Sequence, residues 1–223
     1  MGQSMLILKK AEGVERPALA ASWPTRNGVC AMLDLGADIA ATAEQLVEFA
    51  IMGQAFARVV NGVANPRVAL LNIGSEELKG HESIREAARL IRSSNLPMDF
   101  RGYIEADKIG FGDVDVVVAD GFTGNVALKL YEGSGAVLFR AIRDGLQSSL
   151  RGKIGGLIAK PAFLRLRTKF NADTYGGAYL LGVRGLMIIT HGNASGEAMR
   201  NAIVMGARGA REGLVDRVQS GLA

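Results

Sequence analysis

The amino-acid sequence predicts an α/β protein whose largely parallel sheet is covered on both faces by helices. Short apolar runs alternate with segments of helical periodicity, which is the pattern that strand–helix–strand units produce. Two of these runs lead through a glycine-rich loop into a helix. The composition, with 48% hydrophobic residues and 29 glycines among 223, is that of a turn-rich globular chain rather than a disordered one.

Strands are expected where apolar runs are bounded by turn residues. Arg26-Asn27-Gly28 is typical of a hairpin turn between the first two strands, and Thr190-His191-Gly192 ends the last one. In order, the expected strands span residues 18–21, 29–35, 68–71, 100–104, 114–119 and 186–189.

Helices are expected where apolar residues recur at steps of three and four. The first segment reads as the tail of a helix that runs into Lys9 and Lys10. Thr42 with Gln45 matches a capping box, and Asn95-Leu96-Pro97 breaks a later helix. In order, the expected helices span residues 1–10, 42–60, 83–92, 126–150 and 197–213.

The length and composition fit a single α/β domain over residues 1–223 with a formal net charge of only +4. The one cysteine, Cys30, allows no internal disulfide and is expected to be a small buried residue on a strand. Two histidines without a partner at ligand spacing predict no metal site, and no cofactor is expected. Neither a signal peptide nor a membrane-spanning run is evident, so we expect a cytoplasmic protein.

Two glycine-rich loops follow predicted strands, Asn72 to His81 and Asp120 to Val126. A strand, a glycine turn and a helix together present backbone N–H groups to an anion, and ligands of open α/β sheets bind at the carboxyl ends of strands. The sequence therefore predicts a phosphate-handling enzyme. The polar residues at predicted strand ends are Asp34, Asn72, Asp120 and His191.

Four sequence blocks, taken in order, resemble the bacterial phosphate acyltransferases of phospholipid synthesis, the PlsX family. The resemblance covers essentially the whole chain, and four ordered blocks are far more specific than a lone glycine motif. The blocks are Asp34 to Ala37 (DLGA), Leu70 to Gly80 (LLNIGSEELKG), Asp120 to Lys129 (DGFTGNVALK) and Tyr175 to Gly182 (YGGAYLLG).

The resemblance implies that a long-chain acyl group passes from acyl-acyl carrier protein to inorganic phosphate. The acyl phosphate would then serve a membrane glycerol-3-phosphate acyltransferase. It also implies a homodimer and a three-layer Rossmann-like sandwich similar to phosphotransacetylase and isocitrate dehydrogenase, with no nucleic-acid partner. The family's Asp-Ala-Met-Gly-Gly-Asp and Gly-Asn-Thr-Gly segments are absent, so an N-terminally truncated chain is expected, and Asp38 and His81 replace expected asparagines.

Lys79 and Asn125 are the expected catalytic residues, a role that the resemblance supports. Phosphate is itself a nucleophile and a thiolate leaves readily, so an enzyme needs mainly to position two reactants and stabilise an oxyanion. Lys79 would hold phosphate, and Asn125 would donate its amide to the acyl carbonyl oxygen. The alternatives are a solvated loop lysine and a helix N-cap.

The remaining expected phosphate-binding residues lie in the same two loops or at a strand end. They are Asn72, Gly74, Gly80, Asp120, Gly124 and His191. His191 is equally suited to capping the turn that follows it. Asp34 is expected to accept hydrogen bonds from turn N–H groups, and Glu76 and Glu77 are expected to begin a helix.

Residues 146–170 mix apolar and basic side chains and contain no acid. Pro161 is expected to divide them into two short helices that form a basic amphipathic hairpin. Such a surface suits the inner face of an anionic membrane or an acidic carrier protein, and the alternative is a dimer-packing hairpin with a solvated basic face. The residues expected to make this contact are Leu157, Ile158, Phe163, Arg165 and Arg167.

Three other functions stay open at this point. A non-catalytic remnant that dimerises or binds membrane follows if missing strands remove part of the site. A coenzyme A-dependent phosphotransacylase would differ in its acyl donor. A nucleotide-dependent dehydrogenase is weakly supported, because no Gly-x-Gly-x-x-Gly follows a first strand with an acidic residue about twenty positions on.

Overall fold

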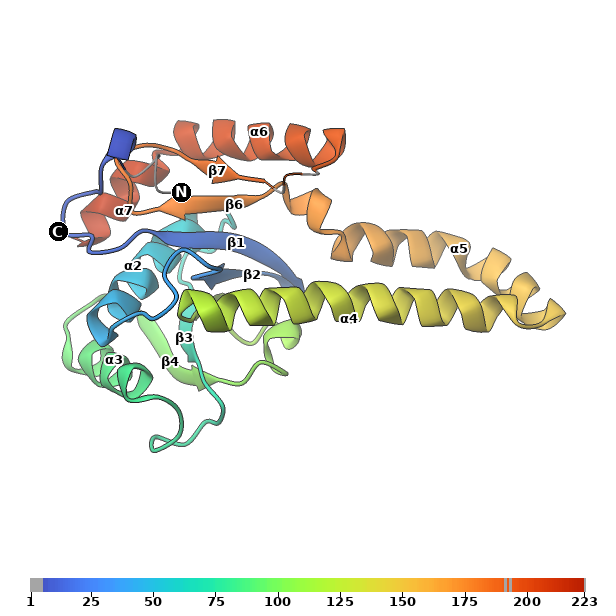
Figure 1. Ribbon diagram of the computed structural model, residues 1–223, viewed down its shortest axis with the longest axis horizontal. Coiled ribbons are helices and arrows are strands. Elements are labelled where there is room, and N and C mark those ends of the chain that lie inside the picture. Colours follow the sequence, from blue (N-terminus) through green and yellow to red (C-terminus); the bar gives the residue numbers. More distant parts are fainter. Residues whose placement is uncertain (1–5, 191, 193, 223) are drawn as a thin grey trace.

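The computed structural model describes residues 6–190, 192 and 194–222. In this part of the chain the strands form one seven-stranded sheet in the order β4-β3-β5-β2-β1-β6-β7 (Figure 1). The strands are β1 (Ala18–Thr25), β2 (Gly28–Leu33), β3 (Arg67–Leu71), β4 (Asp99–Ile104), β5 (Val116–Val118), β6 (Ala178–Leu181) and β7 (Ile188–Ile189).

The described helices include two that are longer than twenty residues. The α-helices are α2 (Ala43–Val59), α3 (Glu82–Ser93), α4 (Gly121–Gln147), α5 (Leu150–Phe170), α6 (Gly196–Arg211) and α7 (Leu214–Leu222). There are also two short 3-10 helices, η1 (Ile109–Phe111) and η2 (Ala172–Tyr175). No helix in the described part of the chain combines the length and hydrophobicity that crossing a bilayer requires.

The sheet is mixed, with a parallel half and an antiparallel half. Strands β4, β3, β5 and β2 run parallel to one another. Strand β1 is antiparallel to both β2 and β6, and β6 is antiparallel to β7. The parallel half confirms the predicted α/β core, and it brings the carboxyl ends of β2, β3 and β5 to one edge of the sheet.

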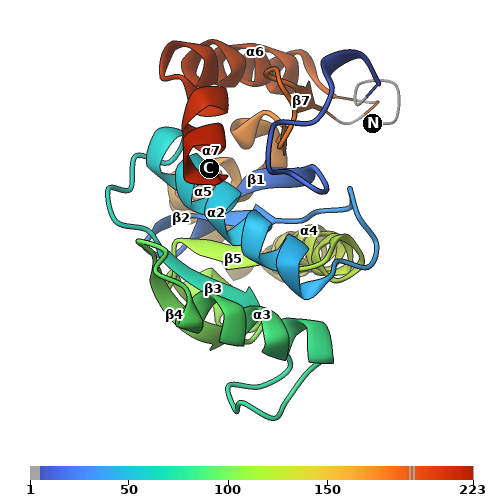
Figure 2. The same cartoon turned by 90° about the vertical axis from the view of Figure 1, so that its left-hand side faces the viewer.

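Helices cover both faces of the sheet and bury a separate apolar cluster on each (Figure 2). Helix α2 packs between α3 and α7 on one face, and its Phe49 and Phe56 side chains are fully buried. Thr42 and Gln45 make both hydrogen bonds of the predicted capping box. Cys30 lies buried on β2 as expected, and burial raises the pKa of its thiol to about 12.

The first half of α4 covers the other face. The ring of Tyr131 stacks on Trp23 of β1 with 4.8 Å between ring centroids, and its hydroxyl donates to the carbonyl oxygen of Pro24 at 2.9 Å. Burial raises the pKa of Tyr131 to about 12. This contact fixes the direction in which α4 leaves the sheet.

Several element boundaries differ from the sequence prediction. Helix α4 begins at Gly121 and not at Val126, because Asp120 supplies the cap. Strand β6 was not predicted, β7 has only two residues, and a second C-terminal helix, α7, follows the predicted one. Of the predicted N-terminal helix tail, residues 6–8 are helical and residues 1–5 lie outside the described part.

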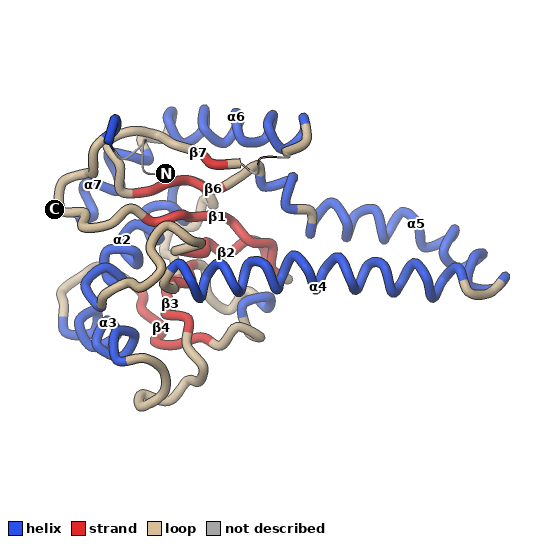
Figure 3. The backbone as a smooth tube through the Cα atoms, in the orientation of Figure 1, coloured by secondary structure: helices blue, strands red, loops and turns tan. Residues whose placement is uncertain are grey.

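Helices α4 and α5 form a long hairpin whose outer part projects from the sheet (Figure 3). We call residues 132–170 the arm. The prediction of two short helices over residues 146–170 was wrong, because α5 is one helix that contains Pro161. Proline removes one backbone hydrogen bond, and on this exposed helix water can satisfy the freed carbonyl.

The prediction of an amphipathic hairpin also needs correction for α5. The helix buries none of its residues, and its apolar side chains do not keep to one side. Leu150, Ile154 and Leu157 share a face by their spacing, whereas Phe163 and Phe170 fall on the opposite face at 100° per residue. Leu164 returns to the first face, so after Pro161 apolar side chains occur on both sides of the helix.

A bidentate ion pair joins the starts of β3 and β5. Arg67 Nε lies 2.8 Å from Asp115 Oδ2, and Arg67 Nη2 lies 3.0 Å from Oδ1. Burial raises the pKa of Asp115, but the hydrogen bonds and charge of Arg67 outweigh it and hold the pKa below its ordinary value of 3.8. A carboxylate with a lowered pKa stabilises the fold above its unfolded-state pKa and stops doing so as the pH falls through its folded-state pKa.

We expect Asp115→Asn to lower the free energy of unfolding by about 2 kcal/mol at neutral pH. The difference from the wild type should shrink below about pH 3.8 and should be constant above pH 5. Urea titrations at several pH values measure it. The matched control is Asp99→Asn, which breaks the exposed pair with Arg101 and should cost less than about 0.5 kcal/mol. Equal losses of unfolding free energy in the two variants would contradict a stabilising role of the Arg67–Asp115 pair.

Candidate functional site

The turn after β2 is organised by Asp34, whose side chain is fully buried. Its carboxylate accepts hydrogen bonds from the backbone N–H groups of Leu19 at 2.8 Å and Asp38 at 2.7 Å, and also from Gly36 and Ala37. This confirms the predicted turn-binding role. Burial raises the pKa of Asp34, while the N–H donors lower it, and the net direction is upward.

The turn after β5 is organised by Asp120, the N-cap of α4. Its carboxylate accepts from the Thr123 backbone N–H at 2.8 Å and from the Thr123 hydroxyl at 2.6 Å. Asn125 is therefore an exposed residue inside the helix and not its cap. The alternative role considered for Asn125 is removed, and its carboxamide is available to a ligand near the positive end of the helix dipole.

These two turns pack directly on each other. Gly121 donates its N–H to the carbonyl oxygen of Asp38 at 2.7 Å. A Cβ atom on Gly124 would overlap the carbonyl oxygen of Asp34, so only glycine allows this approach. On the next residue, the side chain of Asn125 lies beside Gly36, where an added Cβ would be 3.8 Å from it. The backbone of the β2 turn thus fixes where Asn125 stands.

The loop after β3 is closed by Asn72, which is buried. Its side-chain amide donates to the carbonyl oxygen of Lys79 at 3.0 Å, and its side-chain oxygen accepts from the Ile73 N–H at 2.9 Å. Gly80 has a φ of 84°, and a Cβ atom there would overlap the Asn72 side chain. Asn72 therefore shapes the loop that carries Lys79.

The amine of Lys79 lies 3.6 Å from Glu76 Oε1, and its side chain is 53% exposed. Its aliphatic stem lies against Gly74. The expectation that Glu76 and Glu77 begin a helix was wrong, because α3 starts at Glu82 and Glu77 instead pairs with Arg92. Both ion pairs of the loop are exposed to solvent, and the Lys79 cation remains accessible to an anion.

The structure brings the expected site residues together in two groups. Asp120, Gly124 and Asn125 meet the Asp34 turn, whereas Asn72, Gly74, Lys79 and Gly80 form the loop after β3. Both groups start from the same sheet edge, since Leu70 of β3 pairs with Val118 of β5.

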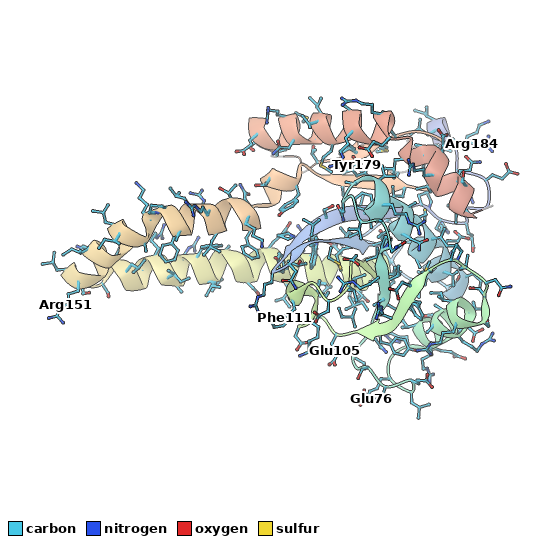
Figure 4. All side chains as sticks on the ribbon, turned by 180° about the vertical axis from the view of Figure 1, so that it is seen from behind. Glu76, Glu105, Phe111, Arg151, Tyr179 and Arg184 are labelled. Atoms are coloured by element: carbon cyan, nitrogen blue, oxygen red, sulfur yellow. The ribbon has the colours of Figure 1, made fainter. Side chains whose placement is uncertain are left out.

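Beyond that edge the two groups diverge. The loop after β3 extends beyond α3, with Glu76 at the outer margin of the molecule (Figure 4). No hydrogen bond or ion pair among the described residues joins Lys79 to Asn125. A pocket shared by these two side chains stays a prediction, and His191 lies outside the described residues.

The arrangement can supply hydrogen-bond donors and a cation, but the described residues of the two loops offer no free carboxylate as a general base. The Asp34 and Asp120 carboxylates are already engaged by N–H and hydroxyl donors. Within residues 6–190, 192 and 194–222, no group of three histidine, cysteine or acidic side chains is placed to hold a metal ion. Hydrogen-bond donors at the start of a helix suit stabilisation of a negatively charged reaction centre.

A row of arginines beside this edge was not identified from the sequence. Arg85, Arg89 and Arg92 line an open depression of about 410 Å³ between α3 and β4. Their spacing of four and three residues places them on one face of the helix. The sequence prediction considered only the spacing of apolar residues and therefore did not identify them.

A family model described as fatty acid synthesis protein matches residues 1–217. The phosphate acyltransferase of Mesorhizobium japonicum is 43% identical over 223 residues, which cover all of this chain and 63% of the relative. The phosphate acyltransferase of Maricaulis maris is 46% identical over 204 residues, which cover 91% of this chain and 58% of the relative. The chain therefore spans less than two thirds of the length of these relatives.

Solved structures with the same fold include a phosphotransacetylase from Streptococcus pyogenes. Its TM-score is 0.63 at 16% identity, covering 93% of this chain and 58% of that one. A branched-chain phosphotransacylase from Enterococcus faecalis matches with a TM-score of 0.56 at 14% identity, covering 90% of this chain and 65% of that one. These similarities confirm the predicted three-layer α/β architecture.

Proposed function

The chain belongs to the fatty acid synthesis protein family, and we propose that it carries out acyl transfer to inorganic phosphate as part of a phosphate acyltransferase. The proposed donor is long-chain acyl-acyl carrier protein, and the product is an acyl phosphate for phospholipid synthesis. The observation that carries the proposal is the exposed carboxamide of Asn125, which the Gly124 contact with the Asp34 turn holds at the start of α4. Names of relatives up to 46% identical support the same activity.

The proposed step requires no covalent enzyme intermediate. A phosphate oxygen attacks the thioester carbonyl carbon, a C–O bond forms, and the carbonyl electrons move to the oxygen. The tetrahedral oxyanion then collapses, the C–S bond breaks, and the carrier thiolate leaves and gains, through water, the proton that the phosphate group loses. Asn125 would donate to the oxyanion, and Lys79 would bind the phosphate that attacks.

The test is trapping of acyl phosphate with hydroxylamine. The chain is incubated with long-chain acyl-acyl carrier protein and inorganic phosphate, and the hydroxamate is measured with and without phosphate. A full-length relative provides the positive control. No phosphate-dependent hydroxamate from this chain, in an assay where the relative is active, rejects the activity for this chain. Substitution of acyl-coenzyme A for the carrier protein separates the two phosphotransacylase classes.

A binding function is the second candidate, and the arm favours it. Leu157 and Ile158 on α5 are 71% and 76% exposed, and no residue of α5 is buried. Arg151 stands at the tip of the arm (Figure 4). We propose that the arm contacts an anionic membrane surface or the acidic carrier protein through these residues together with Phe163, Arg165 and Arg167. A chain that binds vesicles but yields no hydroxamate would fit a non-catalytic role, and sedimentation tests the proposed homodimer.

We expect the double variant Leu157→Glu and Phe163→Glu to lose at least tenfold in binding to anionic vesicles. Each change removes an apolar side chain worth about 2 kcal/mol on burial and adds a charge that anionic lipid repels. Flotation with phosphatidylglycerol vesicles measures the effect. The control is Ile39→Glu with Phe111→Glu, which adds the same charges at exposed apolar residues outside the arm. Unchanged flotation of the arm variant contradicts membrane contact through α5.

A further inference from the structure

Three arginines on α3 form a cationic row at the edge of the sheet. Arg85, Arg89 and Arg92 are separated by four and three residues, so their side chains lie on one face of the helix. Together with Glu77, Ser93 and Tyr103 they line an open depression of about 410 Å³. A volume of this size lies within the range of small-molecule sites.

The row is only partly neutralised. Arg89 pairs with Glu86 at 2.5 Å, and Arg92 Nη1 lies 3.1 Å from Glu77 Oε1. Arg85 has no ion pair among the described residues, and its Nε is buried without a hydrogen-bond acceptor. Like charges one turn apart destabilise a helix, and a buried donor without an acceptor is costly. The first cost falls when an anion occupies the depression, which Arg85 lines without an ion-pair partner among the described residues.

The wall opposite the helix holds Arg92 in place. Its guanidinium carbon lies 5.8 Å from the ring centroids of both Phe100 and Tyr103 on β4. A planar guanidinium held by aromatic rings retains its outer N–H groups for a second ligand, and guanidinium forks match the geometry of phosphate oxygens. Arg92 is therefore oriented before any ligand arrives.

We propose that this depression is a binding site for a phosphate group, supplied as free inorganic phosphate or by the phosphopantetheine arm of an acyl donor. The second source rests on the proposed function, and the first does not. Arg85 and Arg92 contact the phosphate, and Glu77 competes with it for Arg92. Because Glu77 and Lys79 belong to the same loop, phosphate binding here also loosens that loop from α3.

Calorimetric titration of the chain tests the site without turnover. The probes are inorganic phosphate and phosphopantetheine, each at low ionic strength. Arg85→Gln should lower the affinity for the probe about tenfold, because a charged hydrogen-bond donor is lost. Glu77→Gln should raise the affinity for the probe several-fold, because Arg92 then no longer pairs with a carboxylate. The matched control Arg101→Gln removes an arginine of β4 that pairs with Asp99, and it should leave both probes unchanged.

The pattern of effects decides between the sources. If the substitutions change the affinity for phosphopantetheine alone, the site is assigned to the acyl donor. If they change the affinity for inorganic phosphate alone, the site is assigned to the free ion. Equal weakening by Arg85→Gln and Arg101→Gln, or no change in any variant, overturns the proposal. Thermal melts show whether Arg85→Gln is folded, and Arg85→Lys should recover part of the affinity if it is not. Loss of hydroxamate formation with intact Arg85-dependent binding would reject the proposed activity and leave this site standing.

Discussion

Replacing Gly124 by alanine should lower the free energy of unfolding by about 3 kcal/mol or more. The added methyl group would overlap the carbonyl oxygen of Asp34, and that oxygen belongs to a turn held by four backbone N–H groups. The turn cannot move without breaking these hydrogen bonds, and the first turn of α4 cannot move without breaking the bond from the Gly121 N–H to the carbonyl oxygen of Asp38. Urea unfolding followed by far-UV circular dichroism measures the loss.

The control is the same substitution further along the same helix. Nothing lies within 4 Å of a Cβ atom on Gly133, so Gly133→Ala should raise stability by about 0.5–1 kcal/mol through helix propensity alone. The two variants should therefore differ in sign. If Gly124→Ala is as stable as the wild type, α4 does not start against the Asp34 turn, and the placement of Asn125 loses its basis.

The fold was largely predictable because its parallel half rests on local patterns. The apolar runs at β2, β3 and β5 and the capping box of α2 are readable within a few residues of sequence. Strand β6 was missed because it is short and one of its two partners, β1, is distant in the chain. Pro161 led to a wrong prediction of a helix break. Proline usually interrupts a helix, but α5 continues through Pro161, where water can satisfy the freed carbonyl.

The candidate site was predictable by residue type more than by position. A five-residue error in the start of α4 arose because Asp120 and Asn125 are both good N-caps, and the structure shows that Asp120 makes the cap hydrogen bonds to Thr123. In the loop of Lys79, Glu77 pairs with Arg92 fifteen residues away, a pairing that no local rule reveals. Sequence identified the loops, whereas packing determines which side chains they expose.

Asn125→Ala should reduce phosphate-dependent acyl phosphate formation by about 100-fold to 1,000-fold. If the carboxamide donates to the oxyanion, its loss removes a hydrogen bond that is strongest in the transition state, worth about 3–4 kcal/mol of barrier. The effect should fall on kcat with little change in the KM for phosphate. The hydroxamate assay at several phosphate concentrations separates the two quantities. Stability should change little, because Asn125 is exposed and is not the N-cap of α4.

Two comparisons make this outcome specific. Gln147→Ala removes an exposed carboxamide from the distant end of the same helix and should retain full activity. Lys79→Ala should raise the KM for phosphate more than it lowers kcat, because a lysine that binds the nucleophile acts in the ground state as well as the transition state. If Asn125→Ala instead shows the Lys79 pattern, its amide binds phosphate and does not stabilise the oxyanion. If Asn125→Ala retains wild-type rates, the start of α4 has only a structural role. The reacting groups would then lie in the loop that Asn72 closes.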